Sequence, residues 1–106
     1  MAWILLFVAG LLETGFATFL KLADGFTRPL PTVGFVVCAA SSLYLLTLAM
    51  KSIPLGTAYA VWTGLGTAGA VAVGIFWFGD PVSAARLGFL ALLLVAVVGL
   101  RVVSPV

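Results

Sequence analysis

The sequence predicts an all-α membrane protein, with four transmembrane helices in a single domain over residues 1–106. Hydrophobic residues make up 64% of the chain and charged residues only 8%, and the mean hydropathy is +1.34. A water-soluble domain of this length needs far more polar surface to cover itself. Apolar stretches of about 20 residues, long enough for a helix to cross a bilayer, recur between short connectors rich in turn residues. These observations exclude a soluble globular fold.

The inventory of polar side chains also excludes several classes of function. His is absent and Cys38 is the only Cys, so the chain has neither an internal disulfide framework nor the usual clusters of zinc ligands. The formal net charge of +2 comes from scattered residues rather than a basic patch, so nucleic-acid binding is not expected. No nucleophile or cofactor motif is present. We therefore expect no enzyme, no cofactor and no metal site.

The first predicted span, residues 2–20, carries Glu13 near its middle. At a rise of about 1.5 Å per residue, this carboxylate lies far from either end of the helix. An ionised acid in hydrocarbon is costly unless water or a partner compensates it, so Glu13 is a candidate functional residue. The alternative is a carboxylate at headgroup level, or one neutralised by a packing partner. The small residues Ala9, Gly10 and Ala17 share its helical face and leave the neighbourhood of the carboxylate open.

The second predicted span, residues 32–50, is uncharged. It follows a loop, residues 22–31, whose prolines are expected to stop a helix from continuing through it. Ser42 is the hydroxyl in this span that we single out. Because membrane serines most often bond back to their own helix, a structural role and a role in a site both remain open.

The third predicted span, residues 57–78, follows a short connector and carries an aromatic and polar face. Helical spacing places four residues on this face: Tyr59, Trp62, Thr63 and Gly66. Buried Tyr and Trp side chains usually need a polar partner, and Glu13 is the only buried anion available to them. Their rings also attract organic cations. The alternative is a belt of aromatic residues at the lipid interface.

Two glycines in this span, Gly64 and Gly66, form a Gly-Leu-Gly sequence that predicts a hinge. Glycine is also common in membrane helices, where it permits close packing of neighbouring helices. Both interpretations remain open at this stage.

The fourth predicted span, residues 84–103, has Arg86 at its start, in the first turn, and Arg101 near its end. Both long side chains are expected to reach the headgroups. The apolar run over residues 92–99 offers no polar side chain to a cavity. We expect this span to pack against a second copy of the chain, and contact with lipid is the alternative.

Basic residues are almost evenly divided between the two sides of the membrane. An even number of spans places Lys51 and Arg101 on one side, and Lys21, Arg28 and Arg86 on the other. The positive-inside rule therefore has little to act on. A chain that inserts in both orientations permits an antiparallel dimer, and a dimer would give Glu13 the protected cavity that four short helices provide poorly.

The order of these residues resembles one family over the whole length of the chain. Glu13, Lys21, the stretch 25–28 and Ser42 are followed by Pro-Leu-Gly-Thr-Ala-Tyr-Ala-Val-Trp-Thr-Gly-Leu-Gly at residues 54–66. This pattern is similar to the small multidrug resistance family, and most of all to its guanidinium-exporter branch. The resemblance implies an antiparallel, dual-topology homodimer in the inner (plasma) membrane that exchanges protons for a small organic cation.

The resemblance also implies roles for individual residues. Glu13 matches the family's shared carboxylate for protons and substrate, and Tyr59 and Trp62 match its site aromatics. Ser42 matches a hydroxyl in the hydrogen-bond network, and Gly10 matches a small residue packed beside the acid. We add Phe16 and Thr63 as residues that line the site.

Phe16 departs from the family pattern, because the guanidinium branch usually has Trp three residues after the Glu. Phe cannot donate a hydrogen bond. Guanidinium presents paired N–H donors to a carboxylate edge, whereas a quaternary ammonium ion relies on charge, aromatic faces and apolar volume. We expect export of guanidinium or small substituted guanidinium cations. The alternative is a broader exporter of quaternary ammonium and other hydrophobic cations.

Exchange follows from competition for Glu13. Burial and a second Glu13 across a dimer both disfavour the charged form, so we expect the coupled pair to hold at least one proton near neutral pH. An arriving cation favours ionised carboxylates and expels protons.

Two other classes of function remain open. A channel would conduct ions without obligatory exchange, and an accessory membrane subunit would neither conduct nor exchange. A paired heterodimer is a further possibility. Glu13, Tyr59 and Trp62 together favour transport.

Overall fold

The computed structural model describes residues 1–103 and confirms the predicted fold class. These residues form four α-helices that are all long and apolar enough to cross a membrane, and they contain no β-strand. The helices are α1 (Ala2–Leu22), α2 (Pro29–Ala49), α3 (Leu55–Trp77) and α4 (Ala84–Val103).

The start of α2 differs from the sequence-based expectation. The helix begins at Pro29 rather than at residue 32, so the prolines that we placed in the loop lie in its first turn. Proline suits this position, because its fixed φ is helical and its missing N–H would have no intrahelical partner there. Arg28 precedes it with extended backbone angles (φ −105°, ψ 113°), as a residue before proline prefers. At α3 the proline lies outside the helix instead, because Pro54 is the N-cap residue that immediately precedes Leu55.

The connector between α3 and α4 brings the chain back toward α3. Gly79 has a φ of +69°, a left-handed conformation that glycine adopts without steric strain. The N–H of Asp80 donates to the carbonyl of Gly74 at 2.9 Å, which fixes this turn against the end of α3. Ser83 then precedes α4, and its Oγ accepts the backbone N–H of Arg86 at 3.1 Å, as an N-cap serine does.

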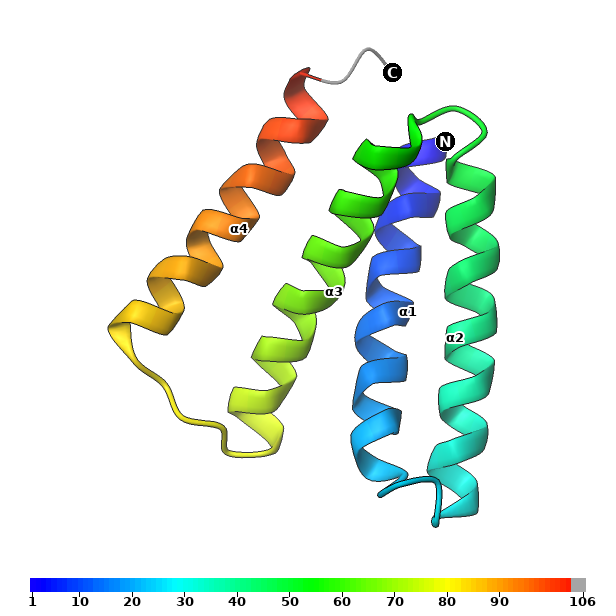
Figure 1. The fold of residues 1–106 in the computed structure, drawn as a ribbon, viewed down its shortest axis with the longest axis vertical. Helices are drawn as coiled ribbons and strands as arrows, with labels where there is room; N and C mark the ends of the chain where they lie inside the picture. The colour runs from blue at the N-terminus through cyan, green and yellow to red at the C-terminus, as the bar shows by residue number, and fades with distance from the viewer. Residues whose placement is uncertain (104–106) are drawn as a thin grey trace.

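The helices pack unequally. Helix α1 runs beside α2 and also packs against α3, whereas α2 and α3 meet over a small area (Figure 1). Helix α4 lies apart from this group, and its backbone approaches α3 alone. Among the residues of α4, only Val97 is buried. One side of α4 therefore presents a long apolar face that none of residues 1–103 covers.

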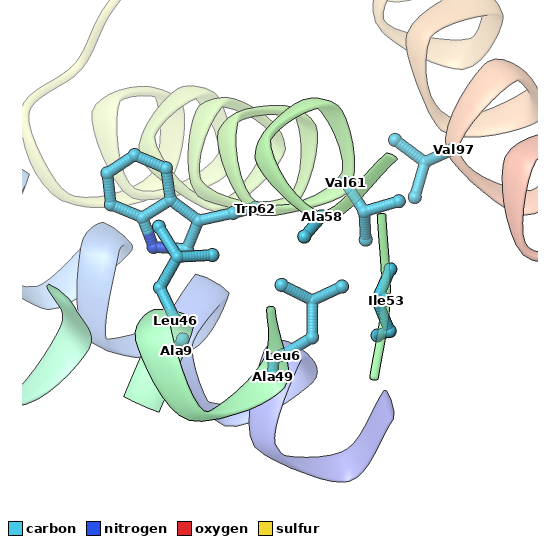
Figure 2. Close-up of a cluster of buried hydrophobic side chains, with 9 residues drawn as sticks. All are labelled: Leu6, Ala9, Leu46, Ala49, Ile53, Ala58, Val61, Trp62 and Val97. Atoms are coloured by element: carbon cyan, nitrogen blue, oxygen red, sulfur yellow. The ribbon is translucent and has the colours of Figure 1, made fainter. Parts of the chain in front are cut away.

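The buried hydrophobic residues gather at one end of the bundle, where the first half of α1 meets the last half of α2 and the first half of α3. Figure 2 shows this cluster: Leu6, Ala9, Leu46, Ala49, Ile53, Ala58, Val61, Trp62 and Val97. We call it the packed end. The second half of α1 and the second half of α3 form the other end, where Glu13 lies beside a cavity. We call this region the cavity end.

Candidate functional site

Glu13 projects from α1 against the backbone of α3. Its carboxylate packs so closely on Gly66 that a Cβ atom at that position would collide with the carboxylate Oε1. The same Oε1 is buried and has no hydrogen-bond partner. Buried polar atoms without a partner are rare in proteins and each calls for an explanation. The structure thus brings Glu13 and Gly66 together and leaves one carboxylate oxygen free to accept a bond.

The close approach of α1 to α3 depends on small residues in both helices. A Cβ at Gly10 would lie 2.8 Å from the Cβ of Leu65, and one at Gly69 would collide with the hydroxyl of Thr14. The Thr14 hydroxyl lies 3.4 Å from the carbonyls of both Gly10 and Gly66. Membrane helices often approach each other at such small residues. Gly10 therefore packs on α3 one turn from the carboxylate of Glu13.

The hinge that we expect at Gly64 and Gly66 lies inside one continuous helix, α3. Each glycine also faces a neighbour: Gly64 faces Val97 of α4, and Gly66 faces Glu13 of α1. Close packing thus gives both positions a reason to be glycine. Bending at these residues stays a prediction.

Ser42 joins three helices through its hydroxyl. The side chain is fully buried, with 0% of its surface exposed. Its Oγ donates to the carbonyl of Ala9 at 2.6 Å and accepts the indole N–H of Trp62 at 2.9 Å. The serine bonds across to α1, so bonding back to its own helix, one of the two alternatives left open for it, is not what the structure shows. The polar partner of Trp62 is Ser42 rather than the expected Glu13, because the three helices converge around this one hydroxyl.

The face predicted for α3 divides into buried and exposed parts. Trp62 is 7% exposed, whereas Tyr59 is 55% exposed in the single chain. The two rings remain neighbours, with centroids 5.6 Å apart and planes tilted by 48°. Thr63 donates its hydroxyl to the carbonyl of Tyr59 at 2.7 Å, within its own helix. Tyr59 and Trp62 thus form an aromatic pair whose outer ring is open.

A cavity of about 320 Å³ opens beside Glu13, between α1, α3 and the start of α4. Its lining residues are Glu13, Phe16, Ala17, Gly66, Thr67, Ala70, Val71 and Arg86. Glu13, Phe16 and Gly66 therefore line one cavity. Ser42, Tyr59, Trp62 and Thr63 are outside its lining. The ring of Phe16 connects the two groups, because its centroid lies 6.5 Å from that of Trp62.

Sequence reasoning missed several of these lining residues. Thr67 and Ala70 continue the predicted face of α3 by one more turn, since each lies four residues after a residue already singled out. Extending the helical pattern would have found them. Arg86 also lines the cavity, and its guanidinium donates to the carbonyl of Pro81 in the exposed connector, whereas the position at the headgroups that we expect for it stays a prediction. The sequence holds no signal for this position, because it depends on how α4 meets the other helices.

Phe16 is surrounded by aromatic rings rather than by hydrogen-bond donors. It packs edge-to-face on Phe35 of α2, with centroids 5.8 Å apart and an interplanar angle of 89°. Edge-to-face contact is a favoured geometry for two rings. Phe35 was not among the predicted site residues. Phe16 thus gives the cavity an apolar wall, and Phe35 packs on Phe16 without lining the cavity itself. Within residues 1–103, no group of His, Cys, Asp and Glu side chains is placed to hold a metal ion.

Comparison with known proteins agrees with this architecture. A family model described as Small Multidrug Resistance protein matches residues 1–93. A guanidinium exporter of Yersinia pseudotuberculosis serotype I (strain IP32953) is 48% identical over 104 residues, covering 98% of this chain and 100% of that protein. The guanidinium exporter of Escherichia coli (strain K12) is 48% identical over 101 residues, covering 95% of this chain and 96% of that protein.

A third relative, the guanidinium exporter of Salmonella typhimurium (strain LT2), is 45% identical over 101 residues, with the same coverage of 95% of this chain and 96% of that protein. The similarity to all three proteins thus extends over almost the full length of both partners. With its four membrane-spanning helices and a family match over most of its length, the chain belongs to the small multidrug resistance family of multi-pass membrane transport proteins.

Proposed function

We propose that the chain exports guanidinium or small substituted guanidinium cations across the inner (plasma) membrane in exchange for protons. The relatives named guanidinium exporter support the substrate class. The position of Glu13 beside a cavity, with one buried oxygen that has no hydrogen-bond partner, supports the location of the binding site. In this proposal the protein works as an antiparallel homodimer, and Glu13 of each copy binds protons and substrate in competition.

Two observations on Glu13 together carry the proposal: the residue lines an open cavity, and its buried Oε1 has no hydrogen-bond partner. A buried carboxylate oxygen without a partner is unfavourable, and no side chain of the described residues relieves it. A proton or a cation in the cavity would do so. Only one of them can neutralise a given carboxylate at a time. Competition of this kind is the simplest basis for coupled exchange.

The chemistry of guanidinium suits this carboxylate. Guanidinium is planar and presents paired N–H donors that match the edge of a carboxylate, and such charge-assisted pairs are the strong ones among hydrogen bonds. Tyr59 and Trp62 add aromatic faces that attract a cation near the site. Ser42 holds Trp62 in place through the bond to its indole N–H. Phe16 and Gly10 shape the space around the carboxylate, and Thr63 supports the adjacent turn of α3.

An inverted second copy would complete what one chain leaves open. The apolar outer face of α4 is uncovered, and the aromatic pair of Tyr59 and Trp62 is open on its Tyr59 side. The nearly even distribution of basic residues permits insertion in both orientations. A second copy would also supply a second Glu13. Two nearby carboxylates titrate as a coupled pair, which suits exchange of a cation for protons.

The test is solid-supported-membrane electrophysiology on purified protein in liposomes. We expect guanidinium currents that depend on the proton gradient. The Glu13→Gln variant keeps the size of the side chain but cannot ionise, so coupled transport should be abolished. Asp24→Asn, in the exposed loop between α1 and α2, is the matched control and should transport as the unmodified protein does. Undiminished coupled currents from Glu13→Gln would rule out Glu13 as the coupling residue.

A second candidate function is export of a broader range of quaternary ammonium and hydrophobic cations. The observation that favours it is the ring of Phe16, which lines the cavity, packs on Phe35 and presents no hydrogen-bond donor beside the carboxylate. Guanidinium, phenylguanidinium and tetrapropylammonium should be compared under matched gradients. Dominant currents from tetrapropylammonium would make multidrug export the better description. Conductance that persists without a proton gradient or counter-transport would instead identify a channel.

A further inference from the structure

The cavity beside Glu13 contains one cationic side chain, Arg86, the third residue of α4. Two contacts hold this residue at the start of its helix. Its backbone N–H donates to Ser83 Oγ at 3.1 Å, and its Nη1 donates to the carbonyl of Pro81. The second contact turns the guanidinium back over the connector. Arg86 as a residue lines the same cavity as Glu13 of α1.

The charges in this cavity oppose each other. Glu13 is the only acid and Arg86 the only base among the lining residues, and the remaining six are uncharged. Arginine stays protonated at every physiological pH. Its guanidinium is also the same chemical group as the cation that we propose as substrate. Any cation that enters the cavity therefore meets a fixed positive charge as well as the carboxylate that attracts it.

We propose that Arg86 sets the affinity of the cavity for its cation, by opposing the cation's positive charge and thereby promoting its release. This inference rests on the proposed function, because it concerns the same carboxylate. A proton neutralises Glu13 without filling the cavity, whereas guanidinium must occupy space next to Arg86. The fixed charge therefore weakens binding of the organic cation more than binding of the proton. It favours release of the organic cation, and thus exchange, over retention of that cation in the cavity.

The expected size of the effect follows from Coulomb's law. We take the separation between the Arg86 guanidinium and a cation in the cavity to be on the order of 10 Å. At effective dielectric constants of about 20 to 40, their repulsion changes a dissociation constant by about 4- to 20-fold. Removal of the charge should therefore tighten binding by about one order of magnitude. Release should slow at the same time.

The experiment measures Kd by isothermal titration calorimetry on the full chain in lipid nanodiscs, with guanidinium and separately with tetrapropylammonium. Arg86→Gln should bind the transported cation about 4- to 20-fold more tightly. In liposomes the same variant should show a lower KM and a lower maximal rate. Arg86→Lys keeps the charge but has a different hydrogen-bonding group, and it should remain within about twofold of the unmodified protein.

Arg101→Gln is the matched control, because it removes an arginine charge from the same helix. Arg101 lies over the ring of Trp3, 4.7 Å from the ring centroid, and lines a different groove. Its removal should leave Kd unchanged. Unchanged or weaker binding by Arg86→Gln would overturn the inference. So would an Arg86→Lys variant that behaves like Arg86→Gln, because the Pro81 contact rather than the charge would then be responsible.

The two cations separate this inference from the proposed function. If the unmodified protein binds tetrapropylammonium but not guanidinium, guanidinium export fails. Arg86→Gln must then still tighten binding of tetrapropylammonium, since charge repulsion acts on any cation. If guanidinium binds but Arg86→Gln does not tighten it, only the role of Arg86 fails. If neither cation binds to the unmodified protein or to Arg86→Gln, both proposals are overturned.

Discussion

The packed end and the cavity end of the bundle treat buried polar groups in opposite ways. At the packed end, the Ser42 hydroxyl donates to Ala9 and accepts from Trp62, so every polar atom of this trio has a partner. At the cavity end, the buried Oε1 of Glu13 has none. The contrast lies within one pair of helices, because α1 and α3 supply residues to both ends.

The difference separates a close-packed region from the region where we propose that the transported cation binds. Satisfied hydrogen bonds in a close-packed region fix one arrangement of side chains. Trp62 donates to Ser42 within such a region, the cluster of buried side chains in Figure 2. A carboxylate with an unsatisfied oxygen beside an open cavity favours binding of a proton or a cation that neutralises its charge. Helix α4 reinforces the contrast, because Val97 joins the packed end whereas Arg86 lines the cavity.

Of three substitutions that test this comparison, Gly66→Ala should have the largest effect, because it changes the residue on which the Glu13 carboxylate packs. The added methyl group would occupy the place of the Glu13 carboxylate and force it to move. We expect guanidinium transport in liposomes to fall by more than about tenfold, since a displacement of about 1 Å can have a hundredfold effect on a positioned group. Gly56→Ala, also in α3, is the control, because a Cβ there meets no atom within 4 Å. Equal activity of the two variants would contradict the assigned position of Glu13.

Ser42→Ala should come next and should act mainly on stability. It removes the acceptor of the Trp62 indole N–H and leaves that buried donor without a partner. We expect unfolding in a detergent titration to require about 1–2 kcal/mol less free energy. The neighbouring Ser41→Ala, at an exposed position of α2, should change stability little. If Ser42→Ala abolished transport without lowering stability, Ser42 would belong to the cavity end rather than to the packed end.

Phe16→Trp should have the smallest effect, because it changes the wall between the two ends without removing a bond. It adds an indole N–H donor beside Glu13 but disturbs the edge-to-face contact with Phe35. One added hydrogen bond should shift the ratio of guanidinium to tetrapropylammonium currents toward guanidinium by about five-fold. Phe16→Leu, which also loses the contact with Phe35 but gains no donor, separates the two effects. An identical ratio in both variants would show that the donor is irrelevant to selectivity.

Much of the fold and one central residue could be predicted without the structure. Long apolar runs specify membrane helices, because the length of a span and the absence of charge are properties of a continuous stretch of sequence. Glu13 could be identified for the same reason, since a carboxylate in the middle of such a run is an exception that the run itself reveals. The start of α2 could not be placed correctly, because proline is compatible both with a loop and with the first turn of a helix.

The four helices, the location of Glu13 within the first of them, and the resemblance to the small multidrug resistance family could thus all be predicted from the order of the residues. Which polar groups meet became known from the packing of the helices: Trp62 with Ser42, Glu13 with the backbone at Gly66, and Arg86 with the cavity. The two differ because helix formation in a membrane depends on local composition. Contacts between helices depend instead on crossing geometry, which residues distant in the sequence set together.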